Sequence, residues 1–299
     1  MTTSTQSKPG GPGPQAWRSA FIRRGPLRFA VIAICFVWAL PTLGLLVSSV
    51  RNPADITRTG WWEALLHPWD LTQWTLSNYA SVLTGDGMAN AFLNSLVVTI
   101  PATVIPITMA AFAAYAFAWI RFPGRGLLFI IMVGLLVVPI QMSLIPIFKL
   151  YVWLHINNTF LGVWLAHSAF GLPLAVFLLY NFISQLPADL FETASIDGAT
   201  HFQMFIRIVL PLSIPALAAF AIFQFLWVWN DLLVAIVFLG ASPEVSVMTF
   251  RLVQMIGDHG EAWQLLTAGA FLTMIVPLTV FLLLQRFFVR GILSGSVKG

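Results

Sequence analysis

The sequence predicts an all-α, polytopic integral membrane protein with six transmembrane helices. Its 299 residues are 59% hydrophobic and only 9% charged, whereas soluble domains carry about 25% charged residues. A helix needs about 20 mainly apolar residues to cross a bilayer. Six charge-free windows meet that length, and we expect each to hold one span: 29–50, 87–120, 126–148, 150–188, 208–230 and 262–285.

The basic residues indicate the orientation, because loops retained in the cytoplasm carry an excess of Lys and Arg. Placing the N-terminus inside puts 11 of the 15 Lys and Arg residues on the cytoplasmic side, and most loop carboxylates on the outer side. We therefore expect both termini in the cytoplasm, with the protein in the cytoplasmic membrane. The excess of basic over acidic residues reflects membrane topology, since no nucleic-acid-binding motif of aromatic and basic residues accompanies it.

The predicted organisation has three parts. Residues 1–27 form a disordered basic cytoplasmic tail, because the first 15 residues are rich in Ser, Thr, Gly and Pro and offer little surface to bury. Residues 28–288 form the six-helix domain, with a cytoplasmic loop at about 184–215. Residues 289–299 form a C-terminal cytoplasmic tail. Tryptophans 61, 62, 69 and 74 in the first outer segment suit an interfacial belt, and stacking on a sugar ring is the alternative.

Several polar residues fall within the predicted spans. Gln141 lies in the outer half of helix three, where it either lines a pore or bonds a neighbouring helix. Helix five is expected from about 214 to 239 and carries Asn230 and Asp231. A carboxylate inside a membrane is costly and suggests function. Asp231 has three interpretations: a structural or gating contact, a substrate-path residue, or a proton-relay residue. We expect His167 to make an interhelical hydrogen bond.

No catalytic constellation is present. The sequence has no phosphate-binding loop of the G-x-x-x-x-G-K-[ST] type, no G-x-S-x-G elbow and no H-E-x-x-H pair. We therefore predict a non-catalytic chain without a cofactor or metal. Such a protein is a conduit, a pore component or an assembly subunit.

The longest polar interruption on the predicted cytoplasmic side spans residues 192–215. Pro187 and Asp189 suit the start of a short helix, and Gly198 is a natural stop. Thr200 and Gln203 form a T-x-x-Q capping box, which predicts a second short helix from residue 201. Its expected apolar stripe is Phe202, Phe205, Ile206 and Val209, ending where Pro211 and Pro215 break the helix. Such a pair of helices could lie in the headgroup layer or fill a groove on a partner.

The spacing of this segment resembles the EAA loop of importer permeases of the ATP-binding-cassette class. The matching residues are Glu192, Ala194, Gly198, Ile208, Leu210 and Pro211, with Thr193 in place of the usual alanine. Asp197, Ala199, Phe205 and Pro215 extend the similarity to carbohydrate permeases. The segments 115–125, 229–231, 285–291 and 297–299 resemble the smaller permease subunit of maltose-type importers, and 60–62 and 170–173 are similar to α-glucoside permeases.

This resemblance implies partners and roles. The chain would supply half of a sugar path beside a second permease subunit, with two ATPase subunits and an extracytoplasmic sugar-binding protein. Coupling to an ATPase would fall on short helices between spans four and five, at residues Glu192, Ala194, Asp197, Gly198, Ala199, Thr200, Phe205 and Arg207. The tail residues Arg290, Ser296 and Lys298 would contact the ATPases. Gln141, Asn230 and Asp231 are candidate path residues, and Glu244, Asp258 and Glu261 are candidate contacts for the binding protein. An ion-coupled transporter and a membrane scaffold subunit are the alternatives.

Overall fold

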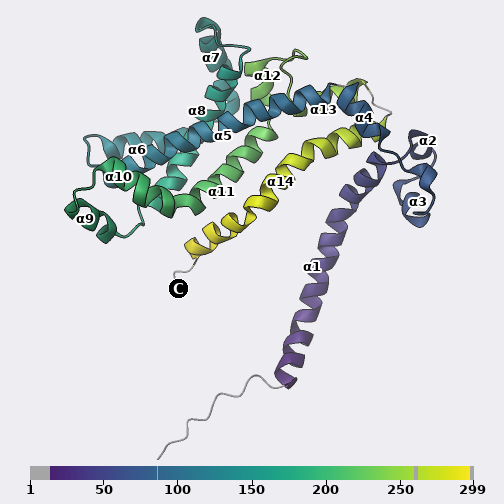
Figure 1. The fold of residues 1–299 in the computed structure, drawn as a ribbon, viewed down its shortest axis with the longest axis horizontal. Coiled ribbons are helices and arrows are strands. Elements are labelled where there is room, and N and C mark those ends of the chain that lie inside the picture. The colour runs from purple at the N-terminus through teal and green to yellow at the C-terminus, as the bar shows by residue number, and fades with distance from the viewer. Residues whose placement is uncertain (1–13, 86, 259–261, 297–299) are drawn as a thin grey trace, which may run out of the picture. The chain divides into compact units, whose positions relative to one another are not determined.

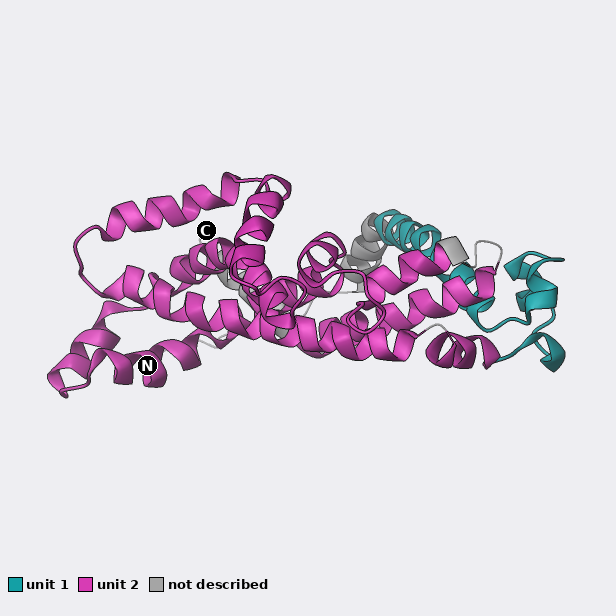
Figure 2. Cartoon of the chain, turned by 90° about the horizontal axis from the view of Figure 1, so that it is seen from above, with its two compact units in different colours: residues 1–75 teal, residues 76–299 magenta. Residues whose placement is uncertain are grey.

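A computed structural model of the chain describes residues 14–85, 87–258 and 262–296, and this part of the chain is helical, with a single isolated bridge between Arg51 and Trp74. The chain divides into two compact units, residues 1–75 and 76–299 (Figures 1 and 2). The first unit contains α1 (Pro14–Ser49), α2 (Pro53–Ile56), α3 (Trp61–Leu66) and the 3-10 turn η1 (Leu71–Gln73).

The second unit holds the remaining elements. In chain order they are α4 (Ser77–Thr84), α5 (Met88–Trp119), α6 (Arg125–Gly134), η2 (Leu135–Val137), α7 (Ile140–Trp153), α8 (Phe160–Ile183), α9 (Ala188–Ile196), α10 (His201–Met204), the π-helical turn η3 (Phe205–Val209), α11 (Leu210–Trp229), α12 (Leu233–Leu239), α13 (Met248–Asp258) and α14 (Trp263–Ser296).

Five helices of the described residues are long and apolar enough to cross a membrane: 25–49, 88–119, 160–183, 201–229 and 263–285. A sixth span is formed only if α6–η2 and α7 count as one, because the two pieces meet at an angle of 106°. The helical class is therefore confirmed, with five to six candidate spans. The first helix begins at Pro14, inside the segment expected to be a disordered tail.

The third predicted span is bent, because the chain turns at Val138 and Pro139. Both residues have extended backbone, with ψ values of 117° and 129°. A proline disfavours the helical conformation of the residue before it, so α6 and η2 end at this point. Gln141 consequently lies exposed in the first turn of α7, beyond the bend.

The fifth helix also differs from its expected course. Instead of one helix over 214–239, α11 ends at Trp229 and α12 begins at Leu233. At its other end, Pro211 and Pro215 do not break the chain, and residues 201–229 form one continuous span. The π-helical turn η3 ends at Val209, two residues before Pro211, and such a widened turn accommodates a residue that lacks an N–H donor.

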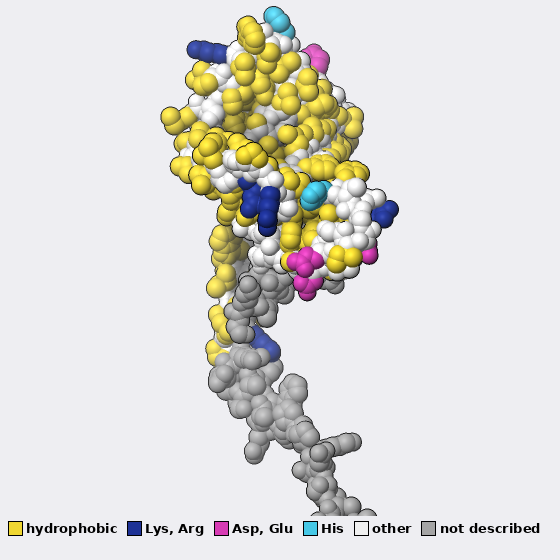
Figure 3. Space-filling view, turned by 90° about the vertical axis from the view of Figure 1, so that its left-hand side faces the viewer, with side chains coloured by type: hydrophobic (Ala, Val, Ile, Leu, Met, Phe, Trp, Pro, Cys, Tyr) yellow, Lys and Arg dark blue, Asp and Glu magenta, His cyan; other side chains and the backbone are white. Residues whose placement is uncertain are grey.

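The core of the second unit is built around α5 and α8, which pack against each other more extensively than any other helix pair of the described chain. Buried alanines at 102, 110, 111 and 114 lie on α5, and small side chains allow membrane helices to approach closely. Outward-facing side chains are largely hydrophobic, as Figure 3 shows for the end that carries α9 and α10. This is the expected surface of a chain surrounded by lipid.

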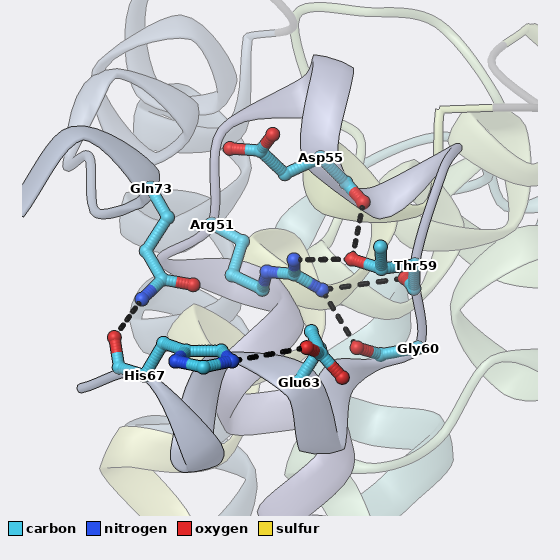
Figure 4. Close-up of polar contacts among 7 residues, drawn as sticks. All are labelled: Arg51, Asp55, Thr59, Gly60, Glu63, His67 and Gln73. Carbon is cyan, nitrogen blue, oxygen red and sulfur yellow. Dashed lines mark hydrogen bonds and ion pairs between the residues drawn. The ribbon is translucent and has the colours of Figure 1, made fainter. Parts of the chain in front are cut away.

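In the first unit, a buried arginine organises the segment after α1 (Figure 4). The Arg51 guanidinium donates to the Gly60 carbonyl at 2.9 Å, to the Thr59 carbonyl at 3.3 Å and to the Thr59 hydroxyl at 2.7 Å. The backbone N–H of Asn52 donates to the Gln73 carbonyl at 2.8 Å and closes the same loop. The fixed fork of guanidinium donors suits such a set of oxygen acceptors, so Arg51 holds the turn that leads into α3.

Candidate functional site

The predicted pair of short helices is present as α9 and α10. Gly198 separates them with a φ of +76°, a left-handed conformation that favours glycine. The capping box is complete: the Gln203 N–H donates to the Thr200 hydroxyl at 3.3 Å, and the Thr200 N–H donates to the Gln203 side chain at 2.8 Å. The bend at Gly198 and the helix start at His201 are thus confirmed.

The first anchor of this pair joins α9 to the end of α5. The ring of Phe191, the one buried residue of α9, stacks on Trp119 with centroids 3.7 Å apart and planes 22° apart. The Trp119 indole N–H in turn donates to the Ile183 carbonyl at 3.1 Å. One tryptophan therefore fixes α9 to α5 and to the last turn of α8.

A second anchor joins α10 and η3 to α5. Tyr115 and His201 share a hydrogen bond of 3.0 Å between the hydroxyl and Nδ1. The Phe205 ring packs 5.5 Å from the Tyr115 ring and stacks on Phe112 at 4.5 Å. With two anchors one helical turn apart on α5, α9 and α10 are held to the helix bundle at both ends. We call α9, the turn 197–200 and α10 the knob.

The apolar stripe expected on the second short helix is only partly correct. Phe205 and Val209 are buried, but Phe202 is 65% exposed and Ile206 is 42% exposed. Met204 is buried in their place. The π-helical turn at 205–209 explains the difference, because it shifts the register by one residue relative to the regular spacing on which the stripe was based.

Several side chains of the knob are exposed. Ile196 is 86% exposed, and the acidic residues Glu192 and Asp197 near it in the sequence are exposed as well. Of the predicted coupling residues, Glu192, Asp197, Gly198, Thr200 and Arg207 are exposed, Ala194 and Ala199 are half-buried, and Phe205 is buried. Phe205 is thus an internal anchor, whereas Ile196 and Phe202 are exposed, as the polar members of the set are.

Asp231 lies in the break between α11 and α12. Its carboxylate accepts a hydrogen bond from the Ala235 N–H at 3.0 Å, as at a helix N-terminus, and stands 3.8 Å from Nε2 of the fully buried His167. Its own carbonyl accepts from the Thr249 hydroxyl at 2.7 Å. Both residues had been singled out in the sequence, but their pairing had not, since no spacing rule joins positions on two different helices.

The remaining candidate residues are dispersed. Asn230 is exposed and bonds the Leu226 carbonyl of its own helix at 2.7 Å. Glu244 is exposed, and hydrogen bonds from its own N–H and from the Ser242 hydroxyl hold the pKa of its carboxyl below the usual range. Asp258 ends α13, while its side chain is not described, and Glu261 lies outside the described residues. Arg290 and Ser296 belong to α14 without described side chains, and Lys298 lies outside the described residues.

The chain can now be compared with known proteins. Residues 88–294, from α5 to near the end of α14, match the family model described as "Binding-protein-dependent transport system inner membrane component". The chain belongs to this family. It is a multi-pass permease subunit of the cytoplasmic membrane in an ATP-binding-cassette importer.

Relatives of the permease are similar over nearly the whole chain. It is 56% identical to the osmoprotective compounds uptake permease protein of Synechocystis sp. (94% of each chain covered). It is 42% identical to the alpha-glucoside transport system permease protein of Rhizobium meliloti (93% and 99% covered). A crystal structure of a bacterial importer of the polysaccharide alginate has the same fold, with a TM-score of 0.73, 20% identity and 90% and 98% of the chains covered.

The permease also contains a cavity that the sequence did not indicate. Its volume is about 390 Å³, and it lies beside the bend, between η2, α7, α8 and α11. Gln224 lines it as a fully buried amide whose nitrogen donates to the Ala102 carbonyl at 3.1 Å. Gly171 makes room for that amide, because a Cβ there would lie 2.6 Å from Oε1 of Gln224. No motif spacing would have selected Gln224.

We predict that Trp119→Leu loosens the knob. The change removes the stacking on Phe191 and the bond to Ile183, which together contribute about 2 kcal/mol. Hydrogen exchange should show faster amide exchange over residues 188–197, with other parts of the permease unaffected. Trp153→Leu is the matched control, because Trp153 is 74% exposed on α7. Equal protection of α9 in both variants would contradict this role of Trp119.

Proposed function

We propose that the permease forms half of the translocation path of an ATP-driven sugar importer. The closure of the ATPase subunits is transmitted to its spans through the knob, which lies on the cytoplasmic side. The knob is the observation that carries this proposal. It is bound to α5 at two points and presents Glu192, Asp197 and the exposed side chain of Ile196 to a partner. A short helical element with exposed apolar side chains suits a groove on another protein.

The relatives support a sugar as the substrate. Their names include alpha-glucoside, arabinooligosaccharides and trehalose transport system permease proteins. The second permease subunit, two ATPase subunits and an extracytoplasmic sugar-binding protein complete the assembly. We place six spans in the membrane, with α6–η2 and α7 together as the third and both termini in the cytoplasm. That topology agrees with the excess of Lys and Arg on the inner side.

Two other functions were open from the sequence. An ion-coupled transporter would use ionisable groups inside the membrane, and the described spans bring together only His167 and Asp231, where Asp231 caps α12. A scaffold subunit would need no path and no knob anchored for force transmission. Both are less well supported than an importer subunit.

Uptake into vesicles distinguishes the three functions. The test uses vesicles that contain the permease, the second permease subunit and the ATPases, with the binding protein outside. Radiolabelled maltose and trehalose are then added. We expect accumulation with ATP inside and none with an imposed proton or sodium gradient. Gradient-driven uptake would favour a secondary transporter. Absence of uptake for every sugar that the binding protein holds would favour a scaffold.

The conformation of Gly198 gives a sharper test of coupling. Its φ of +76° costs a β-branched residue roughly 1–2 kcal/mol, so we predict that Gly198→Val distorts the knob and lowers ATP-driven uptake by about tenfold. The permease should still insert, because a Cβ at this position meets open space.

Gly134→Val is the matched control. A Cβ at Gly134 also meets open space, but its φ of −59° is an ordinary helical value. The control should transport at the parent rate. Uptake by Gly198→Val that equals uptake by Gly134→Val would show that the turn is not part of the coupling element.

A further inference from the structure

A row of polar side chains lies on the first turns of α5, at the end opposite the knob. The Asn94 amide donates to the carbonyls of Glu244 (2.8 Å) and Ser246 (3.1 Å). The Asn90 amide donates to the carbonyls of Pro243 (3.3 Å) and Glu244 (3.2 Å). The Ser95 hydroxyl accepts from the Met248 N–H at 2.8 Å. We call Asn90, Asn94 and Ser95 the latch, and residues 243–248 the outer segment.

The latch fixes a stretch of chain that has little regular structure of its own. The outer segment follows α12 and ends at Met248, the first residue of α13, so many of its backbone hydrogen bonds are made with groups outside it. Asn94 is 8% exposed and Ser95 is 3% exposed. A buried carbonyl that loses its donor raises the free energy of the folded protein. The position of the outer segment therefore depends on the position of α5.

The same helix holds the knob at its other end. Tyr115 and Trp119, in the last two turns of α5, carry the two anchors of α10 and α9. Between the latch and these anchors α5 is one unbroken helix (Figure 1). At about 1.5 Å per residue it is roughly 48 Å long. A single continuous helix, which includes Pro101 and Pro106, thus connects the outer segment with the knob.

A second connection exists but is interrupted. The knob continues directly into α11, and Thr249 after the outer segment bonds Asp231 at 2.7 Å. However, α11 ends at Trp229 and α12 begins at Leu233, so this connection includes a non-helical break. It also has one side-chain bond where the latch has five. The unbroken helix is the better transmitter of a displacement.

We propose that Asn94, supported by Asn90 and Ser95, is a positioning residue that couples the outer segment to the knob through α5. When the sugar-binding protein displaces the segment that carries Glu244, the latch transfers the displacement to α5 and so to α9 and α10. The inference rests on the proposed function, because it requires a binding protein at the outer segment and an ATPase at the knob.

The test is the ratio between ATP hydrolysis with and without the sugar-loaded binding protein, measured on the reconstituted complex with maltose and trehalose as probes. We expect Asn94→Ala to lower this ratio by about tenfold, since the Ser246 carbonyl loses its side-chain donor and the Glu244 carbonyl keeps only the longer bond from Asn90. A purely structural weakening would lower both rates and leave the ratio unchanged. Asn90→Ala, at an exposed position with longer bonds, should lower the ratio less and provides a variant with little risk to folding.

Two further variants complete the experiment. Thr108→Val is the matched control on α5, because the exposed Thr108 bonds the Val104 carbonyl of its own helix, and it should keep the parent ratio. Thr249→Val tests the interrupted connection. Parent ratios in both Asn90→Ala and Asn94→Ala, or a loss confined to Thr249→Val, would overturn the proposal. A parent complex without any stimulation would instead contradict the proposed function.

Discussion

The packing of α5 against α8 is the constraint on which the second unit depends. A membrane helix pair gains little from the hydrophobic effect and relies on close contact between small side chains. The buried alanines at 102, 110, 111 and 114 provide that contact from the middle of α5 toward its C-terminal end. Because α5 is fixed in the bundle, the groups bound to its two ends are fixed as well: the outer segment through Asn94, and the knob through Tyr115 and Trp119.

The spans were predictable because hydropathy measures what a bilayer requires of a helix. The same reasoning could not place the bends. The break at Pro139 occurs inside an apolar stretch, and the break at 230–232 contains the polar residues Asn230 and Asp231, which by themselves do not show that a helix ends there. Proline is also ambiguous in sequence: Pro139 ends a helix, whereas Pro211 follows a π-helical turn and the helix continues. Only the three-dimensional course of the chain distinguishes these cases.

The candidate site likewise has some features that the sequence predicts and others that it does not. The capping box at Thr200 and Gln203 and the bend at Gly198 depend on local backbone chemistry, and both follow from the sequence. The anchors do not, because Trp119 and Phe191 lie on separate helices and nothing in their spacing pairs them. The same is true of His167 with Asp231, and of Asn94 with the carbonyl of Glu244. Long-range pairs of this kind determine how the knob is held.

The central claim is that α5 and the knob move as one body. Cys35 is the single cysteine of the sequence, so a Cys35→Ser background allows spin labels at two chosen positions. We select Glu192, exposed on α9, and Val97, 42% exposed in the N-terminal half of α5. Electron spin resonance distances should be the same in the nucleotide-free and ATP-trapped complexes. A shifted or broadened distance distribution on trapping would contradict the account.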